Sequence, residues 1–189
     1  MIVFCRDHEA CILNRKLLLD SCKMLSDSGV WCIPESTLSA CASYPDLGQL
    51  RVALSRHVKA GIVEKMGPKL YANPFLRPPS TGLFRLTNFL RPGELFYLST
   101  ESVLSEHGWI SQIPFCLTFV TEGRSYRYST LLGDIDFVHT DESPEAWEGH
   151  IFRNHDRQVW EASPHKALVD LRRYKRNLGL VLAESERPE

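Results

Sequence analysis

The sequence lacks a long uninterrupted hydrophobic run. Its longest apolar stretches, such as Phe115–Val120, have the length of a strand and fall far short of the 20 or so residues that span a bilayer. Met1–Cys5 is followed at once by Arg6 and Asp7, which leaves too short an apolar segment for a secretory signal peptide. We therefore expect a cytoplasmic protein that has no membrane partner.

The sequence also lacks net charge. Its 189 residues hold 22 Lys and Arg against 23 Asp and Glu, for a formal charge of −1, which excludes a polycationic DNA coat or a basic membrane-surface peptide. The charge is divided unevenly, however. Residues 1–79 carry 10 basic and 7 acidic residues (+3), and residues 80–189 carry 12 and 16 (−4). A basic N-terminal part still allows nucleic acid as a partner.

No Cys-x-x-Cys pair is present, although five of the six cysteines fall in the first quarter of the chain. A cytosolic chain of this length does not need disulfides, so we expect buried free thiols and no metal site. The alternative is zinc held by Cys5, His8 and Cys11, but no spacing identifies the fourth ligand that a closed structural site requires.

The first part of the chain predicts three helices and a hairpin. Helical spacing runs over residues 12–27, a short helix follows Pro34, and Asp46 is a good N-cap for a helix that reaches Ala60. Two short strands, Ile62–Met66 and Lys69–Asn73, then surround Gly67-Pro68. This order is typical of a winged helix-turn-helix domain; the alternative is a small helical domain with an incidental hairpin.

A proline-rich segment, Pro74–Gly82, predicts a linker. We accordingly place a winged helix-turn-helix domain at residues 1–76, the linker at 77–83 and a second domain at 84–189. The second domain alternates strand patterns with two helices, one capped by Ser99 and one that begins at Ser163-Pro164. We expect an α+β fold with a mostly antiparallel sheet. Its predicted strands are Leu95–Leu98, Phe115–Thr121, Tyr126–Leu131 and Ile135–His139.

The third helix carries the candidate DNA contacts. If Leu47, Leu50, Leu54 and Val58 face the core, a turn of about 100° per residue directs a polar face outward. Glutamine and arginine can bind base edges bidentately, and lysine suits phosphate. His57 falls near the inward side, where we expect a packed or hydrogen-bonded histidine. The candidate DNA-binding residues are Gln49, Arg51, Val52, Ser55, Arg56 and Lys59 on the helix, with Lys65 and Lys69 on the hairpin. The alternative is an ordinary solvated helix surface.

Catalytic motifs are missing. The sequence has no Gly-x-Ser-x-Gly elbow and no phosphate-binding loop. Asp134 and Asp136 would share one strand face, as metal-binding carboxylates do in nucleotidyltransferases, but the Gly-Ser entry of those enzymes is absent. We predict no catalytic residue and no cofactor; an enzyme that uses the region of His139 is the alternative.

Several stretches resemble the AbiEi-type antitoxins of type IV toxin–antitoxin (abortive-infection) systems. Together they span about residues 50–178, and the later ones are the more diagnostic. The matching stretches are Leu54–Lys65, Gly67–Pro74, Phe96–Gly108, Ile110–Pro114, Val120–Ser125, Phe137–Thr140 and Ser163–Leu171.

This resemblance implies an antitoxin that is also a transcriptional autorepressor. Its winged domain would bind inverted repeats in its own promoter, with two copies or a dimer on adjacent half-sites. Its C-terminal domain would counteract a nucleotidyltransferase-like toxin, without forming a stable complex with it. A stand-alone regulator whose second domain binds a ligand or a protein is the alternative.

Overall fold

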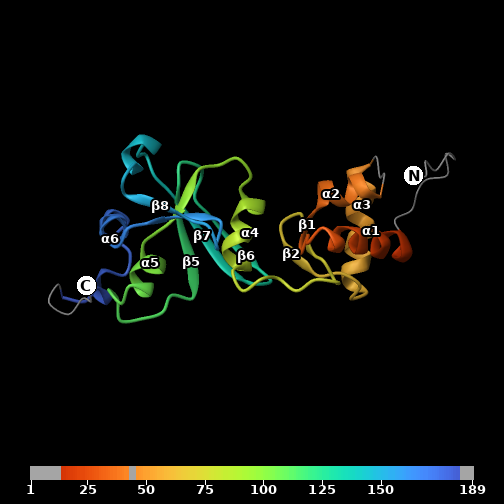
Figure 1. Ribbon diagram of the computed structural model, residues 1–189, viewed down its shortest axis with the longest axis horizontal. Helices are drawn as coiled ribbons and strands as arrows, with labels where there is room; N and C mark the ends of the chain where they lie inside the picture. Colours follow the sequence, from red (N-terminus) through yellow and green to blue (C-terminus); the bar gives the residue numbers. More distant parts are fainter. Residues whose placement is uncertain (1–13, 43–45, 184–189) are drawn as a thin grey trace. The chain divides into compact units, whose positions relative to one another are not determined.

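The protein is α+β, as expected, and it divides into two compact units after Pro78 (Figure 1). The computed structural model describes residues 14–42 and 46–183, which hold six α-helices and two β-sheets. Cys5, His8 and Cys11, the alternative zinc ligands, lie outside the described residues. The two units are considered one at a time.

The first unit combines three helices with a small sheet. Its elements are α1 (Arg15–Asp27), β1 (Cys32–Pro34), α2 (Glu35–Cys41), α3 (Leu47–Lys59), β2 (Lys65–Gly67) and β3 (Leu70–Ala72). The strands form an antiparallel sheet in the order β1-β3-β2. The hairpin is shorter than the sequence predicted, and β1, which has only three residues, gave no alternating pattern to detect.

Local chemistry explains where these helices begin and end. The side chain of Asp46 accepts the backbone N–H of Gly48 at 2.7 Å, which confirms it as the N-cap of α3. Asn14 caps α1 in the same way. Gly29 and Gly61 follow α1 and α3 at φ +73° and +67°, a region in which glycine stops a helix without strain.

The apolar side chains predicted to face inward on α3 form part of the core of the first unit, except for Leu47. Leu50 and Leu54 are fully buried with Leu18 and Ile33, but Leu47 is 43 % exposed. Leu47 is the first residue of α3, and that turn of the helix extends beyond the core. A buried amide, Asn73, donates to the carbonyl oxygens of Cys22 (2.9 Å) and Val30 (2.8 Å), so the end of β3 is tied to α1 and the turn that follows it.

The second unit is built on a six-stranded sheet in the order β6-β7-β5-β4-β9-β8. Three of the five strand pairings are antiparallel, so most of the sheet is antiparallel as expected, but β5 pairs with β7 and β4 with β9 in parallel, which makes the sheet mixed. The strands are β4 (Phe96–Leu98), β5 (Cys116–Thr121), β6 (Tyr126–Thr130), β7 (Gly133–His139), β8 (Ile151–Asn154) and β9 (Val159–Ala162).

Three α-helices and two short 3₁₀ turns complete this unit: α4 (Gly82–Leu90), α5 (Glu101–Glu106), η1 (Pro144–Trp147), α6 (Pro164–Arg173) and η2 (Leu178–Leu180). α4 begins inside the predicted linker, since Gly82 and Leu83 are already helical. Ser163 caps α6 as predicted, by accepting from the backbone N–H of Lys166. Ser99, however, does not cap α5; the residue at that position is Thr100, and Ser99 bonds elsewhere.

The two faces of the sheet differ in character. On β7, Ile135 and Phe137 are buried on one face, and Asp134 and Asp136 alternate with them on the other, as the sequence predicted. Aromatic rings pack edge-on within the apolar face, where Phe96 contacts both Phe119 and Phe137. Figure 1 shows α4 on one side of the sheet and α5 with α6 on the other.

A buried carboxylate joins α6 to β4. Asp170 is inaccessible to solvent, and it accepts hydrogen bonds from the hydroxyls of Ser99 (2.7 Å) and Tyr97 (3.1 Å) and from the ammonium of Lys166 (2.8 Å). Lys166 also pairs with Glu142 at 2.6 Å. Burial by itself lowers the pKa of Lys166, but Asp170 and Glu142 outweigh burial and raise it, so this lysine stays charged.

Asp170→Ala should destabilise the second unit by about 3–5 kcal/mol, because it leaves the buried Lys166 ammonium with one carboxylate fewer. Urea unfolding followed by tryptophan fluorescence measures this, since three of the four tryptophans lie in this unit. Val169→Ala, on the exposed side of the same helix, is the control and should change stability by less than about 0.5 kcal/mol. Equal effects of the two substitutions would show that the network is not a major source of stability.

Candidate nucleic-acid interface

The outward face of α3 carries the residues that the sequence assigned to it. Arg51, Ser55, Arg56 and Lys59 are all exposed, as are Gln49 and Val52. Lys65, the first residue of β2, and Lys69, in the turn between β2 and β3, are both exposed. His57, expected near the inward side, is half-buried.

Five of the eight candidates surround a single hollow between α3 and the hairpin. The hollow has a volume of about 390 Å³. Its walls are formed by Ser55, Val58 and Lys59 of α3, Lys65, Lys69 and Tyr71 of the hairpin, and the pair Glu35 and Arg51. Gln49, Val52 and Arg56 are not among its lining residues, so the structure separates the candidates into a hollow and an adjoining helix surface.

An ion pair fixes one wall of the hollow. The Nε of Arg51 donates to the two carboxylate oxygens of Glu35 at 2.9 and 3.0 Å, and its Nη2 lies 2.8 Å from Oε1. The hydrogen bond with Glu35 raises the pKa of Arg51. The backbone N–H of Glu35 also donates to the carbonyl of Lys69 at 2.9 Å. Arg51 therefore links α3 to Glu35 of α2, whose backbone is bonded in turn to the hairpin, and sequence spacing gave no sign of this partner.

The remaining cations of the hollow are unneutralised. Within the described residues, Lys59, Lys65 and Lys69 make no ion pair, and Glu35, whose charge Arg51 offsets, is the one acidic residue that lines the hollow. Three lysines that line one concave surface, one from a helix and two from a hairpin, attract an anion, and a backbone phosphate is such an anion. The geometry suits phosphate contact from the hairpin and the end of α3, with Gln49 and Arg56 beside it.

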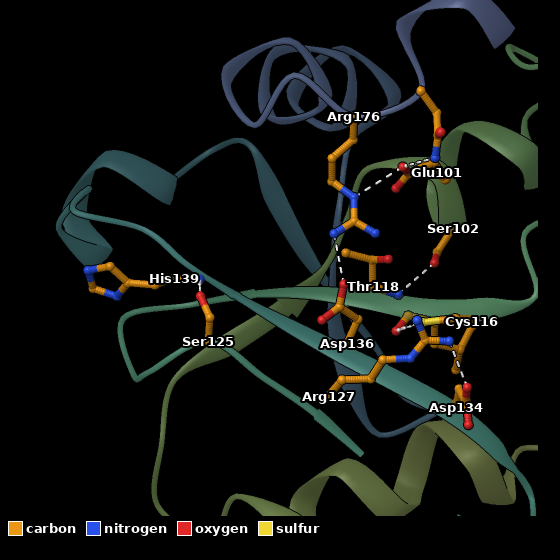
Figure 2. Close-up of polar contacts among 12 residues, drawn as sticks. Glu101, Ser102, Cys116, Thr118, Ser125, Arg127, Asp134, Asp136, His139 and Arg176 are labelled. Carbon is orange, nitrogen blue, oxygen red and sulfur yellow. Dashed lines mark hydrogen bonds and ion pairs between the residues drawn. The ribbon is translucent and has the colours of Figure 1, made fainter. Parts of the chain in front are cut away.

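The second unit has a different arrangement of charge (Figure 2). Arg176 donates to Glu101 (3.1 Å) and to Asp136 (2.7 Å), and Arg127 donates to Asp134 (2.7 Å). These arginines lie on the polar face of the sheet, and the sequence did not single out Arg176 as a partner of Glu101, since the two are 75 residues apart. No group of three or more metal-ligating side chains occurs in the described ranges.

The environment of His139 does not match a nucleophile–histidine–acid arrangement. One ring nitrogen lies 2.9 Å from the carbonyl of Gly123 and the other 3.0 Å from a carboxylate oxygen of Asp141. The hydroxyl of Ser125 accepts a hydrogen bond from the backbone N–H of His139, not from its ring (Figure 2). Both ring nitrogens thus face an acceptor, Gly123 or Asp141, rather than a hydroxyl.

The four cysteines that the structure describes are free, and Cys41 and Cys116 are only partly buried, where buried thiols were expected. Cys22 and Cys32 are buried, and burial raises the pKa of Cys22 to about 11 and that of Cys32 to about 12. These thiols are protonated at neutral pH and behave as small apolar side chains.

Comparisons with known proteins give no relative. No protein-family model matches the chain, and no curated protein matches it. The resemblance to AbiEi-type antitoxins therefore stands on the sequence motifs alone. None of the described helices has the length and apolar character required to cross a membrane.

His139 should titrate above the ordinary histidine value of about 6.5, because Gly123 and Asp141 both favour its charged form and raise its pKa. This contribution to stability is present below pH 6.5 or so and is lost as the pH rises through the folded-state pKa. NMR titration of the imidazole measures the midpoint. Asp141→Asn should lower it; a wild-type midpoint at or below that of an unstructured peptide would contradict the assigned hydrogen bonds.

Proposed function

We propose that the protein is a DNA-binding transcriptional autorepressor whose first unit is a winged helix-turn-helix domain. The observation that carries the proposal is the hollow in which Lys59, Lys65 and Lys69 converge beside the exposed face of α3. In this assignment α3 enters the major groove, Arg56 and Gln49 bind base edges, and the hairpin lysines bind phosphate.

The element order supports this assignment. A helix, a short strand, two helices and a hairpin, closed by a three-stranded antiparallel sheet, is the arrangement in which a winged helix presents its third helix and its wing on one side. The Glu35–Arg51 pair fits the same assignment, because it fixes the angle of the third helix without using Arg56 or the hairpin lysines.

The second unit is assigned antitoxin activity on the basis of its motifs. Phe96–Gly108 and Ser163–Leu171 resemble the AbiEi-type blocks, and the proposal is that this unit counteracts a nucleotidyltransferase-like toxin without a catalytic site of its own. A stand-alone regulator whose second unit binds a ligand or a protein is the alternative.

DNA binding is tested with the full chain and the DNA upstream of its own gene, by fluorescence anisotropy over a series of salt concentrations. Affinity should fall steeply with salt, because phosphate contacts release counterions. Lys65→Ala should weaken binding to all sequences and reduce the slope of log K against log salt by about 1. Lys23→Ala, an exposed lysine on α1, is the matched control and should leave the slope unchanged.

The same titration separates base contacts from phosphate contacts. Arg56→Ala should cost about 1–3 kcal/mol of binding free energy on the preferred site and relax the preference for it. Arg15→Ala, an exposed arginine of α1, is the control. A salt-independent affinity, or an affinity and a site preference that Arg56→Ala leaves unchanged, would contradict the proposed interface.

Antitoxin activity is tested by co-expression of the full chain with a nucleotidyltransferase-like toxin encoded beside it. Growth should be rescued, and rescue should persist in a variant that carries both Arg56→Ala and Lys65→Ala, because the two activities lie in different units. Persistence of rescue with His139→Ala would count against the enzymatic alternative. Absence of rescue with the wild-type chain would leave the stand-alone regulator as the better description.

A further inference from the structure

A hollow of about 270 Å³ lies beside the polar face of the second unit. Ile110 and Leu180 supply apolar walls, and Glu101, Arg127 and Arg176 supply the charged ones. The residues that line the hollow all belong to the second unit. Its volume is just below the roughly 300–1,000 Å³ of pockets for drug-sized ligands, so it suits a smaller molecule.

The arginines of this hollow are already paired within the chain. Arg127 donates to Asp134 at 2.7 Å. Arg176 donates to Asp136 at 2.7 Å and to Glu101 at 3.1 Å. An anionic ligand would have to compete with these carboxylates for each guanidinium, so the two arginines do not mark an anion site.

One carboxylate oxygen of Glu101, by contrast, has no partner. Glu101 is only 3 % exposed, and its Oε1 accepts from Arg176 and, at 2.8 Å, from the amide of Asn177. Its Oε2 is buried and makes no hydrogen bond within the described residues. Figure 2 shows this carboxylate directed toward Arg176, over the part of β5 that carries Thr118, and all three residues line the hollow. A buried acceptor without a donor costs free energy that a ligand can recover.

The ion-pair network around the hollow carries one negative charge in excess. Two guanidiniums, those of Arg127 and Arg176, meet the three carboxylates of Glu101, Asp134 and Asp136. No lysine or histidine of the described residues lines the hollow. Burial raises the pKa of Glu101, but the hydrogen bonds that it accepts and the charge of Arg176 outweigh burial and lower it, so the carboxylate stays ionised. The excess charge therefore lies beside an apolar wall.

The backbone before Glu101 holds this carboxylate in place. Thr100 has φ +52° and ψ −134°, a conformation that a β-branched residue rarely adopts. Such strain persists only where the surrounding structure over-determines it, and it clusters at ligand-binding and active sites. Glu101 is the first residue of α5, and Ser102 after it accepts the N–H of Thr118 on β5 at 2.8 Å. The carboxylate is thus positioned before a ligand arrives.

We propose that this hollow binds a small molecule that joins one protonated amine to a compact apolar group. The ammonium donates to Oε2 of Glu101 and balances the excess negative charge. The apolar group packs against Ile110 and Leu180 and removes their surface from water. The site lies wholly in the second unit, so it does not rest on the proposed DNA binding.

An NMR titration of the isotope-labelled full chain tests the proposal with benzylamine, which is protonated at neutral pH. Benzyl alcohol has the same ring without the charge, and benzoate has the opposite charge. Benzylamine should bind at least about tenfold more tightly than either, because charge-assisted hydrogen bonds are the stronger ones. The shift changes should be concentrated in the backbone amides of Ile110, Gln112, Thr118 and Leu180, which line the hollow.

Substitution of Glu101 identifies the acceptor. Glu101→Gln keeps the shape of the side chain and removes its charge, so it should weaken benzylamine binding about tenfold and leave benzyl alcohol binding nearly unchanged. Glu106→Gln is the matched control, because Glu106 lies on the same helix, pairs with Arg157 and does not line the hollow. This substitution should leave the affinity for benzylamine unchanged.

A surface variant keeps the test valid if Glu101→Gln does not fold. Gln112 is exposed and lines the hollow, so Gln112→Lys should fold and, by adding a like charge, weaken benzylamine binding by about threefold. Gln112→Glu should not weaken it. The proposal would be overturned by a wild-type chain that does not bind benzylamine, by tighter binding of benzoate, by shift changes outside the hollow, or by equal losses with Glu101→Gln and Glu106→Gln. Loss of DNA binding with benzylamine binding intact would instead count against the proposed function alone.

Discussion

The buried carboxylate of Asp170 is the constraint on which the second unit depends. An isolated charge cannot remain in a protein interior, so Asp170 requires the hydroxyls of Tyr97 and Ser99 and the ammonium of Lys166, and these requirements fix α6 against β4. The position of α6 in turn decides where the chain emerges from it. Arg176 follows three residues after the helix ends, and from there it reaches both Glu101 and Asp136. The polar face of the sheet is thus organised by a carboxylate on another element.

The two units use charge in opposite ways. The first gathers Lys59, Lys65 and Lys69 around one hollow and neutralises Arg51 with Glu35. The second alternates arginine with aspartate on an open sheet face. The first pattern suits a polymer of one sign, and the second suits a surface that carries both signs. A formal charge of −1 for the whole chain averages these patterns and describes neither of them.

Local sequence signals predicted much of the fold. The features that were missed depend on contacts between residues far apart in the sequence. The caps at Asp46 and Ser163 and the apolar period of α1, α3 and α6 act over a few residues, so the sequence displays them directly. Ser99 was predicted to be a helix cap because it precedes a helix. Its actual partner, Asp170, is 71 residues away and could not be found from the local sequence. The commitment of Arg51 to Glu35 was equally invisible, and so were the parallel strand pairings, which join segments that are not neighbours in sequence. For the DNA interface, exposure could be predicted for every candidate, but the gathering of five of them around a hollow required the fold.

The hydrogen-bond network around Asp170 is built from residues of two of the sequence stretches described above. Tyr97, Ser99, Lys166 and Asp170 lie within Phe96–Gly108 and Ser163–Leu171; all four are buried, and the first three all bond to Asp170. Substitution of any of the four therefore disturbs the packing of a helix against a strand, whatever the surface outside them binds. Exposed residues outside the network, such as those on the outward face of α3, can be changed without disturbing this packing. The residues that hold the second unit together and the residues exposed to a partner are therefore separate sets in this molecule.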